Sequence, residues 1–165
     1  MIHEEKRDGF VITTDPARLD ADAIYAYLSR VYWANTRSRD AVERSLKNSL
    51  CFGLYEGDKQ IGLARVISDY ATFAYVCDVY VLEAYQGNGL GTWLMKVVMA
   101  HPDLQGLRRW LLATRDAHRL YRKSGFKELE APERWMEILT TAPGSPSSTL
   151  DSPSSSRYQG GDSNP

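Results

Sequence analysis

The sequence has no long apolar run, almost no net charge and only two cysteines. No stretch approaches the roughly 18 uninterrupted apolar residues of a membrane span. The N-terminal segment MIHEEKRDGF is charged and lacks the apolar core of a signal peptide. The formal net charge is −1 over 165 residues, whereas binding to DNA or RNA calls for a clustered excess of Lys and Arg. We therefore expect a cytoplasmic protein that binds neither a membrane nor nucleic acid.

The two cysteines do not form a recognisable metal-binding or redox motif. Cys51 and Cys77 both lie in apolar, strand-like sequence, without C-x-x-C spacing and without a histidine nearby. A chain of this length also needs no disulfide or metal ion to fold. Two buried thiols are the simplest interpretation, and no metal site is expected.

The composition is that of one globular domain followed by a tail. Hydrophobic residues make up 43% of the chain and charged residues 25%, which is enough apolar material for one core. From residue 142 onward Ser, Pro, Gly and Asp dominate, and such a segment cannot bury enough surface to offset its ordering entropy. We predict a folded domain over residues 8–140 and a disordered tail over residues 142–165.

Hydrophobic periodicity predicts alternating strands and helices. Strands are expected at 10–13, 50–55, 60–68, 73–82, 109–114, 126–129 and 134–139, and helices at 19–31, 39–48, 89–100 and 116–124. Ser38 and Asp116 are the expected caps of two of these helices, and Gly125 is expected to end the last one. Antiparallel hairpins come first and strand–helix–strand units follow. This order predicts an α/β fold of the α+β kind, with a mixed, largely antiparallel central sheet flanked by helices.

The most informative segment follows the long strand at 73–82. Gly87, Gly89 and Gly91 alternate between this strand and an amphipathic helix. Glycine lets the backbone approach a ligand closely, and free N–H groups at a helix N-terminus bind phosphate oxygens. A turn that needs glycine for its local geometry alone explains the pattern equally well. The segment contains no Gly-Lys-Ser/Thr, and its G-x-G-x-G spacing differs from the G-x-G-x-x-G of dinucleotide-binding folds.

At this point the sequence resembles the GNAT acetyltransferases. Gln86, Gly89 and Gly91 match the coenzyme A signature Gln/Arg-x-x-Gly-x-Gly/Ala of that family, and residues 120–126 resemble its L-Y-x-x-x-G-F segment. The resemblance covers residues 8–140 and implies a GNAT-type sheet. Thr114 stands where many members have Asn, and Glu83-Ala84 stands where many have Pro-Glu.

The resemblance implies an N-acetyltransferase that moves an acetyl group from acetyl-CoA directly to a primary amine of a small molecule or peptide, without a metal. The resemblance implies three groups of cofactor-binding residues. Backbone N–H groups at a bulge come from Val79, Tyr80 and Val81, and Thr114 lies beside the pantetheine arm. The pyrophosphate is surrounded by Gln86, Gly87, Asn88, Gly89, Leu90, Gly91 and Thr92. Tyr121 matches the tyrosine that serves as general acid in many relatives; packing under the sheet is the alternative.

The general base stays open at this stage. The general base of some relatives is a glutamate at positions matching Tyr75 or Cys77, neither of which is a carboxylate. Asp78 is a further candidate, although strand alternation points it to the opposite face. A water relay from Tyr75 or Tyr80 is equally consistent.

The acceptor site of this fold is usually walled by the loop between the first two helices, here residues 32–38. Trp33 and Arg37 in that loop suit a planar or anionic acceptor; a core edge and a solvated arginine are the alternative. The acceptor itself is not specified, and neither is the choice between monomer and homodimer. A non-catalytic acyl-CoA-binding regulatory module is the competing function.

Overall fold

The computed structural model describes residues 1–140, and the chain divides into two units, Met1–Trp135 and Met136–Pro165. Every helix and strand of the described part belongs to the first unit. The predicted tail at 142–165 lies outside the described residues, so its disorder stays a prediction.

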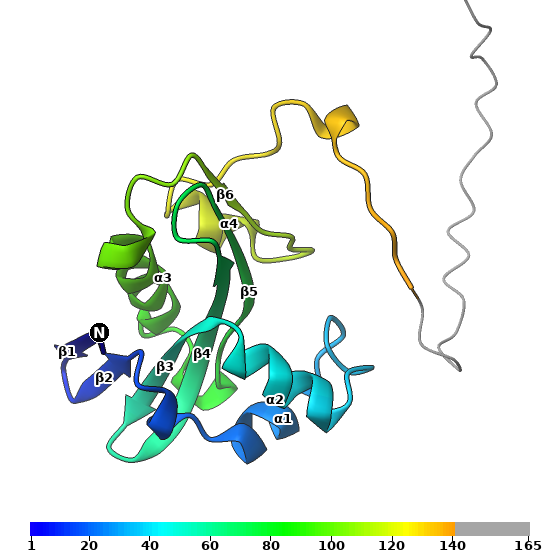
Figure 1. Cartoon of the computed structure of the whole chain (residues 1–165). Helices are drawn as coiled ribbons and strands as arrows, with labels where there is room; N and C mark the ends of the chain where they lie inside the picture. The colour runs from blue at the N-terminus through cyan, green and yellow to red at the C-terminus, as the bar shows by residue number, and fades with distance from the viewer. Residues whose placement is uncertain (141–165) are drawn as a thin grey trace, which may run out of the picture. The chain divides into compact units, whose positions relative to one another are not determined.

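A six-stranded sheet forms the centre of the first unit (Figure 1), with its strands in chain order. The strands are β1 (Glu4–Arg7), β2 (Phe10–Thr13), β3 (Leu50–Glu56), β4 (Lys59–Ser68), β5 (Phe73–Val81) and β6 (Arg109–Leu111). Neighbours from β1 to β5 pair antiparallel, and β5 pairs with β6 in parallel. The mixed, largely antiparallel sheet predicted from the sequence is therefore confirmed.

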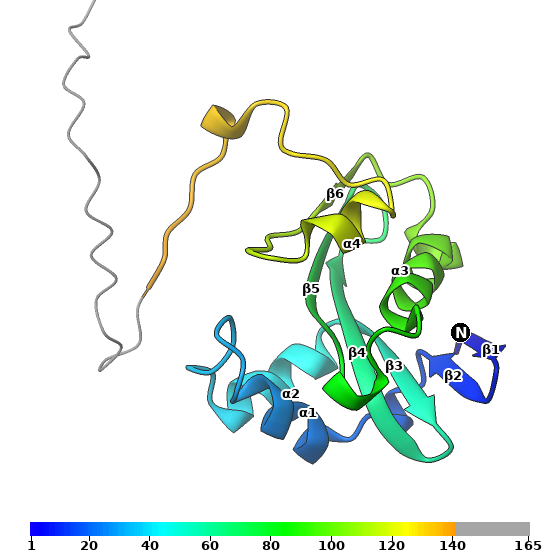
Figure 2. The ribbon, with the colours of Figure 1, turned by 180° about the vertical axis from the view of Figure 1, so that it is seen from behind.

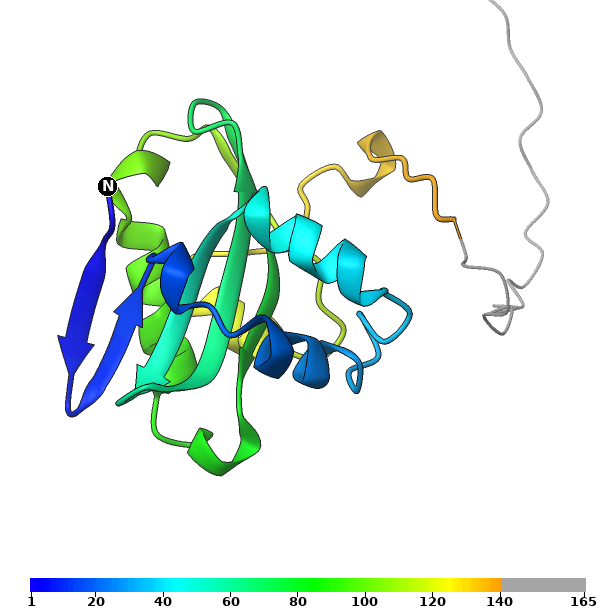
Figure 3. The same cartoon turned by 60° about the horizontal axis from the view of Figure 1, so that its bottom comes forward.

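Helices cover both faces of this sheet, as Figure 3 shows. The helices are α1 (Ala21–Leu28), α2 (Arg39–Lys47), α3 (Leu90–Ala100) and α4 (His118–Arg122), with short 3-10 turns at Pro16–Arg18, Glu83–Tyr85, Pro102–Leu104 and Pro132–Arg134. Buried residues of α3, among them Leu94 and Val98, pack on Phe52 and Val76 in the main core. On the other face α1 and α2 bury a second cluster against Leu63 and Tyr80. The sheet is thus apolar on both faces, which explains the nearly continuous hydrophobic runs of β3 and β4.

A side chain caps the N-terminus of α1 and of α2, whereas α4 begins without a side-chain cap. Asp20 and Ser38 accept hydrogen bonds from backbone N–H groups of the first turns of α1 and α2, as N-cap residues do. The prediction that Asp116 caps α4 is wrong, because α4 begins after Ala117 and has no side-chain cap. The hydroxyl of Thr114 accepts a hydrogen bond from the Ala117 N–H at 3.0 Å instead. Gly125 follows α4 with φ +91°, as expected of a terminating glycine.

Other differences from the predicted elements concern the two ends of the domain. β1 was not predicted, because its sequence EEKR is charged and lacks alternating apolar residues. The strands predicted at 126–129 and 134–139 do not form, and β6 is shorter than the predicted 109–114. Within residues 112–140 the chain instead runs as coil with one short helix and one 3-10 turn. Strand propensity depends on a neighbouring ladder, and these segments pair with no strand of the described chain.

Candidate active site

The two last strands of the sheet separate after a short parallel pairing. β5 and β6 pair only over Phe73↔Arg109, Ala74↔Trp110 and Tyr75↔Leu111. β5 then continues to Val81 while the chain after β6 turns away toward α4 (Figure 2). Beyond Tyr75 the edge of β5 that faces β6 therefore has no ladder partner, and its backbone groups are available to another molecule.

On its other edge β5 carries a bulge at Asp78 and Val79. The register passes from Arg65↔Cys77 to Leu63↔Tyr80, so two residues of β5 stand opposite Ala64 alone. Asp78 has φ +49°, in the left-handed region that Asp tolerates better than most residues. A bulge of this kind frees backbone groups and reorients side chains.

The bulge overturns the predicted orientation of Asp78. The alternation along β5 shifts by one residue there, so Asp78 lies on the same face as Cys77. On this face one carboxylate oxygen of Asp78 accepts a bond from Arg65 Nε at 2.7 Å, and both oxygens accept bonds from Arg37 Nη1 at 2.7 and 2.8 Å. The Asp78 side chain is only 1% exposed. Both carboxylate oxygens already accept hydrogen bonds from guanidinium groups, and this geometry disfavours Asp78 as the general base.

The glycine turn connects the end of β5 to α3. Gly87 and Gly89 have φ +85° and +71°, and Gly89 is the N-cap of α3. A Cβ atom built on either glycine meets nothing within 4 Å, so open space surrounds the turn. No side chain caps α3, and its first turn holds no acidic residue. The free N–H groups and the positive end of the helix dipole therefore face this open space, as a phosphate site requires.

Two further residues of the signature flank the turn. Gln86 Nε2 donates a hydrogen bond to the carbonyl oxygen of Val81 at 2.9 Å, which fixes the turn to the end of β5. Gly91 lies inside α3, where a Cβ would only touch Leu120 and Val81 at ordinary contact distances of 3.8 to 4.0 Å, so the packing there does not require glycine. The residues of the turn thus fit a bound pyrophosphate.

Tyr121 lies in α4 and packs edge-to-face on Phe126, with ring centroids 6.0 Å apart. Burial, together with smaller contributions from Asp116, Cys77 and Tyr32, raises the pKa of Tyr121 to about 12. Tyr121 and Thr114 line one cavity of about 1080 Å³ with β6 and the segment after α4. The phenol is therefore neutral at physiological pH and able to donate a proton.

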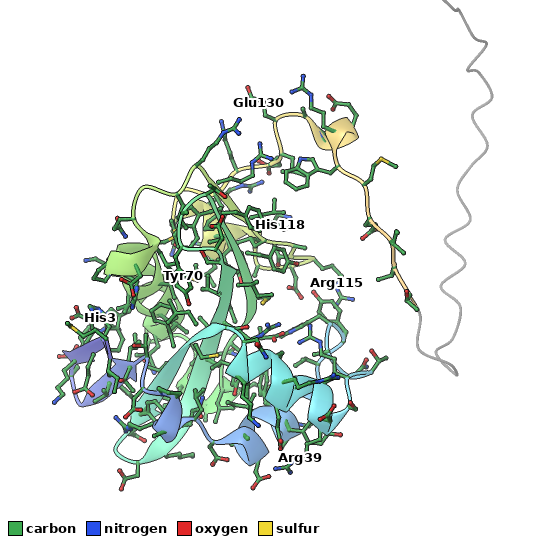
Figure 4. All side chains as sticks on the ribbon, in the orientation of Figure 1. His3, Arg39, Tyr70, Arg115, His118 and Glu130 are labelled. Atoms are coloured by element: carbon green, nitrogen blue, oxygen red, sulfur yellow. The ribbon has the colours of Figure 1, made fainter. Side chains whose placement is uncertain are left out.

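The loop between α1 and α2 approaches the loop that follows β6. Arg115 lies over the Tyr32 ring at 3.6 Å from its centroid, and Figure 4 shows Arg115 reaching from the second loop toward the first. Trp33 packs edge-to-face on Tyr32 at 5.1 Å. Tyr32 and Trp33 are both exposed, so they do not form a core edge. Arg37 is not simply solvated, because it binds Asp78.

Both thiols lie on the α1–α2 side of the sheet. Cys51 is buried in the cluster beneath α1 and α2, and burial raises its pKa to about 12. Cys77 stands beside the bulge, and burial raises its pKa to about 11. Both thiols are therefore protonated at physiological pH and are weak nucleophiles.

The structure brings most of the predicted site residues together but gives some of them only backbone roles. Tyr80 is buried and stacks on Tyr27 with ring centroids 3.8 Å apart, so its side chain does not face the separated strands. Leu90 is buried in the main core. Two site residues were missed from the sequence, Arg65 and Arg115. Arg65 carried a signal, since a charged residue within the apolar run of β4 needs a buried partner.

The described helices include none with the length and apolar character needed to cross a bilayer. The structure combines an α/β fold with an open glycine turn, a bulged strand and a neutral tyrosine near the point where two strands separate. These features are typical of an acyltransferase.

Comparison with known proteins gives the same class. The profile of the Acetyltransferase (GNAT) family matches residues 18–126. A Gibberella zeae protein named "Putative acetyltransferase FG08082" is 38% identical over 146 residues, which covers 74% of this chain and 81% of that protein. The chain therefore belongs to the GNAT family of acetyltransferases.

Solved structures show the same fold. A GNAT-family structure from Xanthomonas campestris pv. campestris is 46% identical and superposes with a TM-score of 0.79, covering 82% of this chain and 96% of that one. A predicted acetyltransferase from Clostridium acetobutylicum, solved with acetyl-CoA, shares the fold at 16% identity and a TM-score of 0.58, covering 84% of this chain and 96% of that one.

Proposed function

We propose that this acetyltransferase moves an acetyl group from acetyl-CoA directly to a primary amine of a small molecule or peptide. The observation that carries the proposal is the open, uncapped N-terminus of α3 at Gly87 and Gly89, which lies immediately after the bulged strand β5. Direct transfer requires the donor and the acceptor to meet at one place, and the bulge and Tyr121 surround such a place.

The donor binds along the edge of β5 in this proposal. The N–H groups of residues 87–92 hold the pyrophosphate, and the unpaired edge of β5 beyond Tyr75 is available to the amide groups of the pantetheine arm. Thr114 lines the neighbouring cavity with Tyr121, although its hydroxyl already accepts a bond from the Ala117 N–H. The same fold carries acetyl-CoA in the Clostridium acetobutylicum structure.

Two groups of the chain serve the chemical step. Negative charge develops on the thioester oxygen as the amine attacks, and a backbone N–H freed at the bulge near Val79 is a preorganised donor for it. The departing thiolate then needs a proton. Tyr121 is neutral and keeps its proton until then, because burial raises its pKa to about 12.

The remaining side chains argue against a covalent acyl-enzyme. Cys77 is the thiol nearest the bulge, and burial keeps it protonated by raising its pKa to about 11.

The carboxylate of Asp78 is occupied by two arginines. The proton of the acceptor ammonium therefore leaves through water, with Tyr75 as the hydroxyl that lies on this face near Arg37.

The test combines ligand binding with thiol release. Acetyl-CoA should raise the unfolding temperature, because a ligand that binds only the native state stabilises it by mass action, while NAD and ATP should not. Primary amines should release free coenzyme A thiol in proportion to acetylated product. Stabilisation by acetyl-CoA without transfer to any amine would indicate a binding module instead of an enzyme. No stabilisation by acetyl-CoA would refute the proposed role of the turn.

A further inference from the structure

Beside the bulge of β5, positively charged side chains outnumber negatively charged ones. Arg37 and Arg65 share the single carboxylate of Asp78, so two guanidinium groups face one carboxylate. The pair with Arg65 is buried, with exposed side-chain fractions of 8% and 1%. Charges in such a place are weakly screened by water, and the excess of one positive charge acts on whatever binds above it.

Arg37 is the member of this cluster that a ligand can reach. Its side chain is 32% exposed, and within residues 1–140 its hydrogen bonds to Asp78 come from Nη1 alone. Nε and Nη2 of the same planar group therefore remain as donors. The Asp78 carboxylate anchors the Arg37 guanidinium on one side. The free donors on its other side are well placed to bind a second carboxylate.

A second cation lies beside the loop that carries Arg37. Arg115 stacks on Tyr32, and its guanidinium is 4.0 Å from Asp116, the outer limit of an ion pair. Trp33 packs edge-to-face on Tyr32. The wall formed by Tyr32, Trp33 and Arg115 thus adds a positive charge and apolar area, and Asp116 is the carboxylate beside Arg115.

The arginines reach the bulge through the loop between α1 and α2. Arg37 binds Asp78 in the bulge of β5, and Arg115 contacts Tyr32 in the same loop as Arg37. Both arginines therefore lie on the loop side of the bulge. An acceptor bound by Arg37 can place its amine at the bulge.

We propose that the acceptor is a small amine that carries a carboxylate, with Arg37 and Arg115 binding the carboxylate. This inference rests on the proposed function and narrows it from primary amines in general to amino-acid-like ones. The same positive charge favours the neutral form of the acceptor amine over its ammonium form, which promotes attack without a carboxylate base. A polyamine or a lysine-rich peptide would instead meet repulsion at this wall.

The experiment compares matched acceptor pairs. Each free amino acid of a standard panel is assayed with acetyl-CoA against its own carboxamide, and kcat/KM is determined from thiol release. At least one free acid should exceed its amide by about tenfold or more, because a charge-assisted hydrogen bond is lost in the amide. Glutamate α-amide, which keeps its side-chain carboxylate, shows whether the α-carboxylate or any nearby carboxylate is bound.

Three variants assign the preference to the wall. Arg37→Gln should bring the ratio of acid to amide close to one. Arg115→Gln removes an exposed side chain and should lower the ratio without a loss of stability that could confuse the result. Arg44→Gln is the control, since Arg44 forms an exposed pair with Asp40 on α2 and should leave the ratio unchanged.

Transfer to amines with no preference for the free acids would overturn this inference and leave the proposed function intact. An unchanged ratio in both Arg37→Gln and Arg115→Gln, or a collapse of the ratio in Arg44→Gln, would also overturn it. Absence of transfer to every acceptor in the panel would overturn the inference, and transfer to primary amines without a carboxylate would then show that the proposed function still holds.

Discussion

Replacing Gly89 by alanine separates the stability of the turn from its ability to bind acetyl-CoA. Gly89 has φ +71°, a conformation that costs a residue with a Cβ atom about 1–2 kcal/mol. The new Cβ meets no atom of residues 1–140 within 4 Å, so no steric clash within the described structure adds to this cost. The variant should therefore fold, with an unfolding temperature lower by a few degrees.

The effect on binding should be larger than the effect on stability. The methyl group occupies the open space at the α3 N-terminus, where the pyrophosphate oxygens must approach the backbone N–H groups. Each charge-assisted hydrogen bond contributes about 1.5–3 kcal/mol. Because 1.4 kcal/mol corresponds to a tenfold change in Kd, the loss of one such bond should weaken acetyl-CoA binding about tenfold or more. Gly89→Asp adds a negative charge and should weaken it further.

Gly106 provides the matched control for this experiment. It has φ +74°, and a Cβ there also meets nothing within 4 Å, but it lies beyond the C-terminal end of α3. Gly106→Ala should lower the unfolding temperature by a similar amount and leave the Kd for acetyl-CoA unchanged in isothermal titration calorimetry. If Gly89→Ala bound acetyl-CoA as tightly as Gly106→Ala does, the pyrophosphate would not lie at this turn.

Four other outcomes are expected. Tyr121→Phe should lower kcat roughly 10²- to 10⁴-fold with little change in acetyl-CoA affinity. Because the pKa of Tyr121 is about 12, the loss should be the same from pH 6 to 9. Near-normal turnover of the variant would show that Tyr121 is a packing residue. Asp78→Asn should cost about 3–5 kcal/mol of unfolding free energy in urea titrations, since it leaves buried guanidinium charge uncompensated. Burial lowers the pKa of His101 below 6.5, so the folded state resists protonation, and the unfolding free energy should decrease as the pH falls below 6.5; His101→Gln should flatten that decrease. Deleting residues 142–165 should leave the unfolding temperature and acetyl-CoA binding unchanged, and a large loss would show that the tail docks.

Local patterns were sufficient to predict most of the fold. Apolar alternation located β2 to β5, and the Ser38 cap marked the start of α2, because both signals depend on residues close together in the chain. Patterns failed where a strand depends on its neighbours. The charged β1 forms because β2 offers it a ladder, whereas residues 126–129 and 134–139 have strand-forming sequence but no strand partner in the described structure.

The glycine turn was equally accessible from the sequence, since its glycines lie close together at a strand–helix junction. The acceptor side was not. The pair between Arg37 and Asp78 spans 41 residues of sequence, and Arg115 meets Tyr32 across an even longer interval. Such contacts depend on how the α1–α2 loop, β5 and the loop after β6 come together in the folded protein. Local periodicity in the sequence does not encode that arrangement.

Asp78 shows why the error in strand alternation mattered for function. A strand of regular pleat would have directed this carboxylate into the core beneath α3, among apolar residues such as Val76 and Leu94. The bulge moves it to the face of α1 and α2, and the strained φ of +49° is retained because the carboxylate binds Arg65 and Arg37. The same irregularity leaves the backbone near Val79 outside the regular ladder. Asp78 therefore links the strand edge proposed for the acetyl donor to the loop proposed for the acceptor, and a change at Asp78 should affect both sides of the proposed reaction.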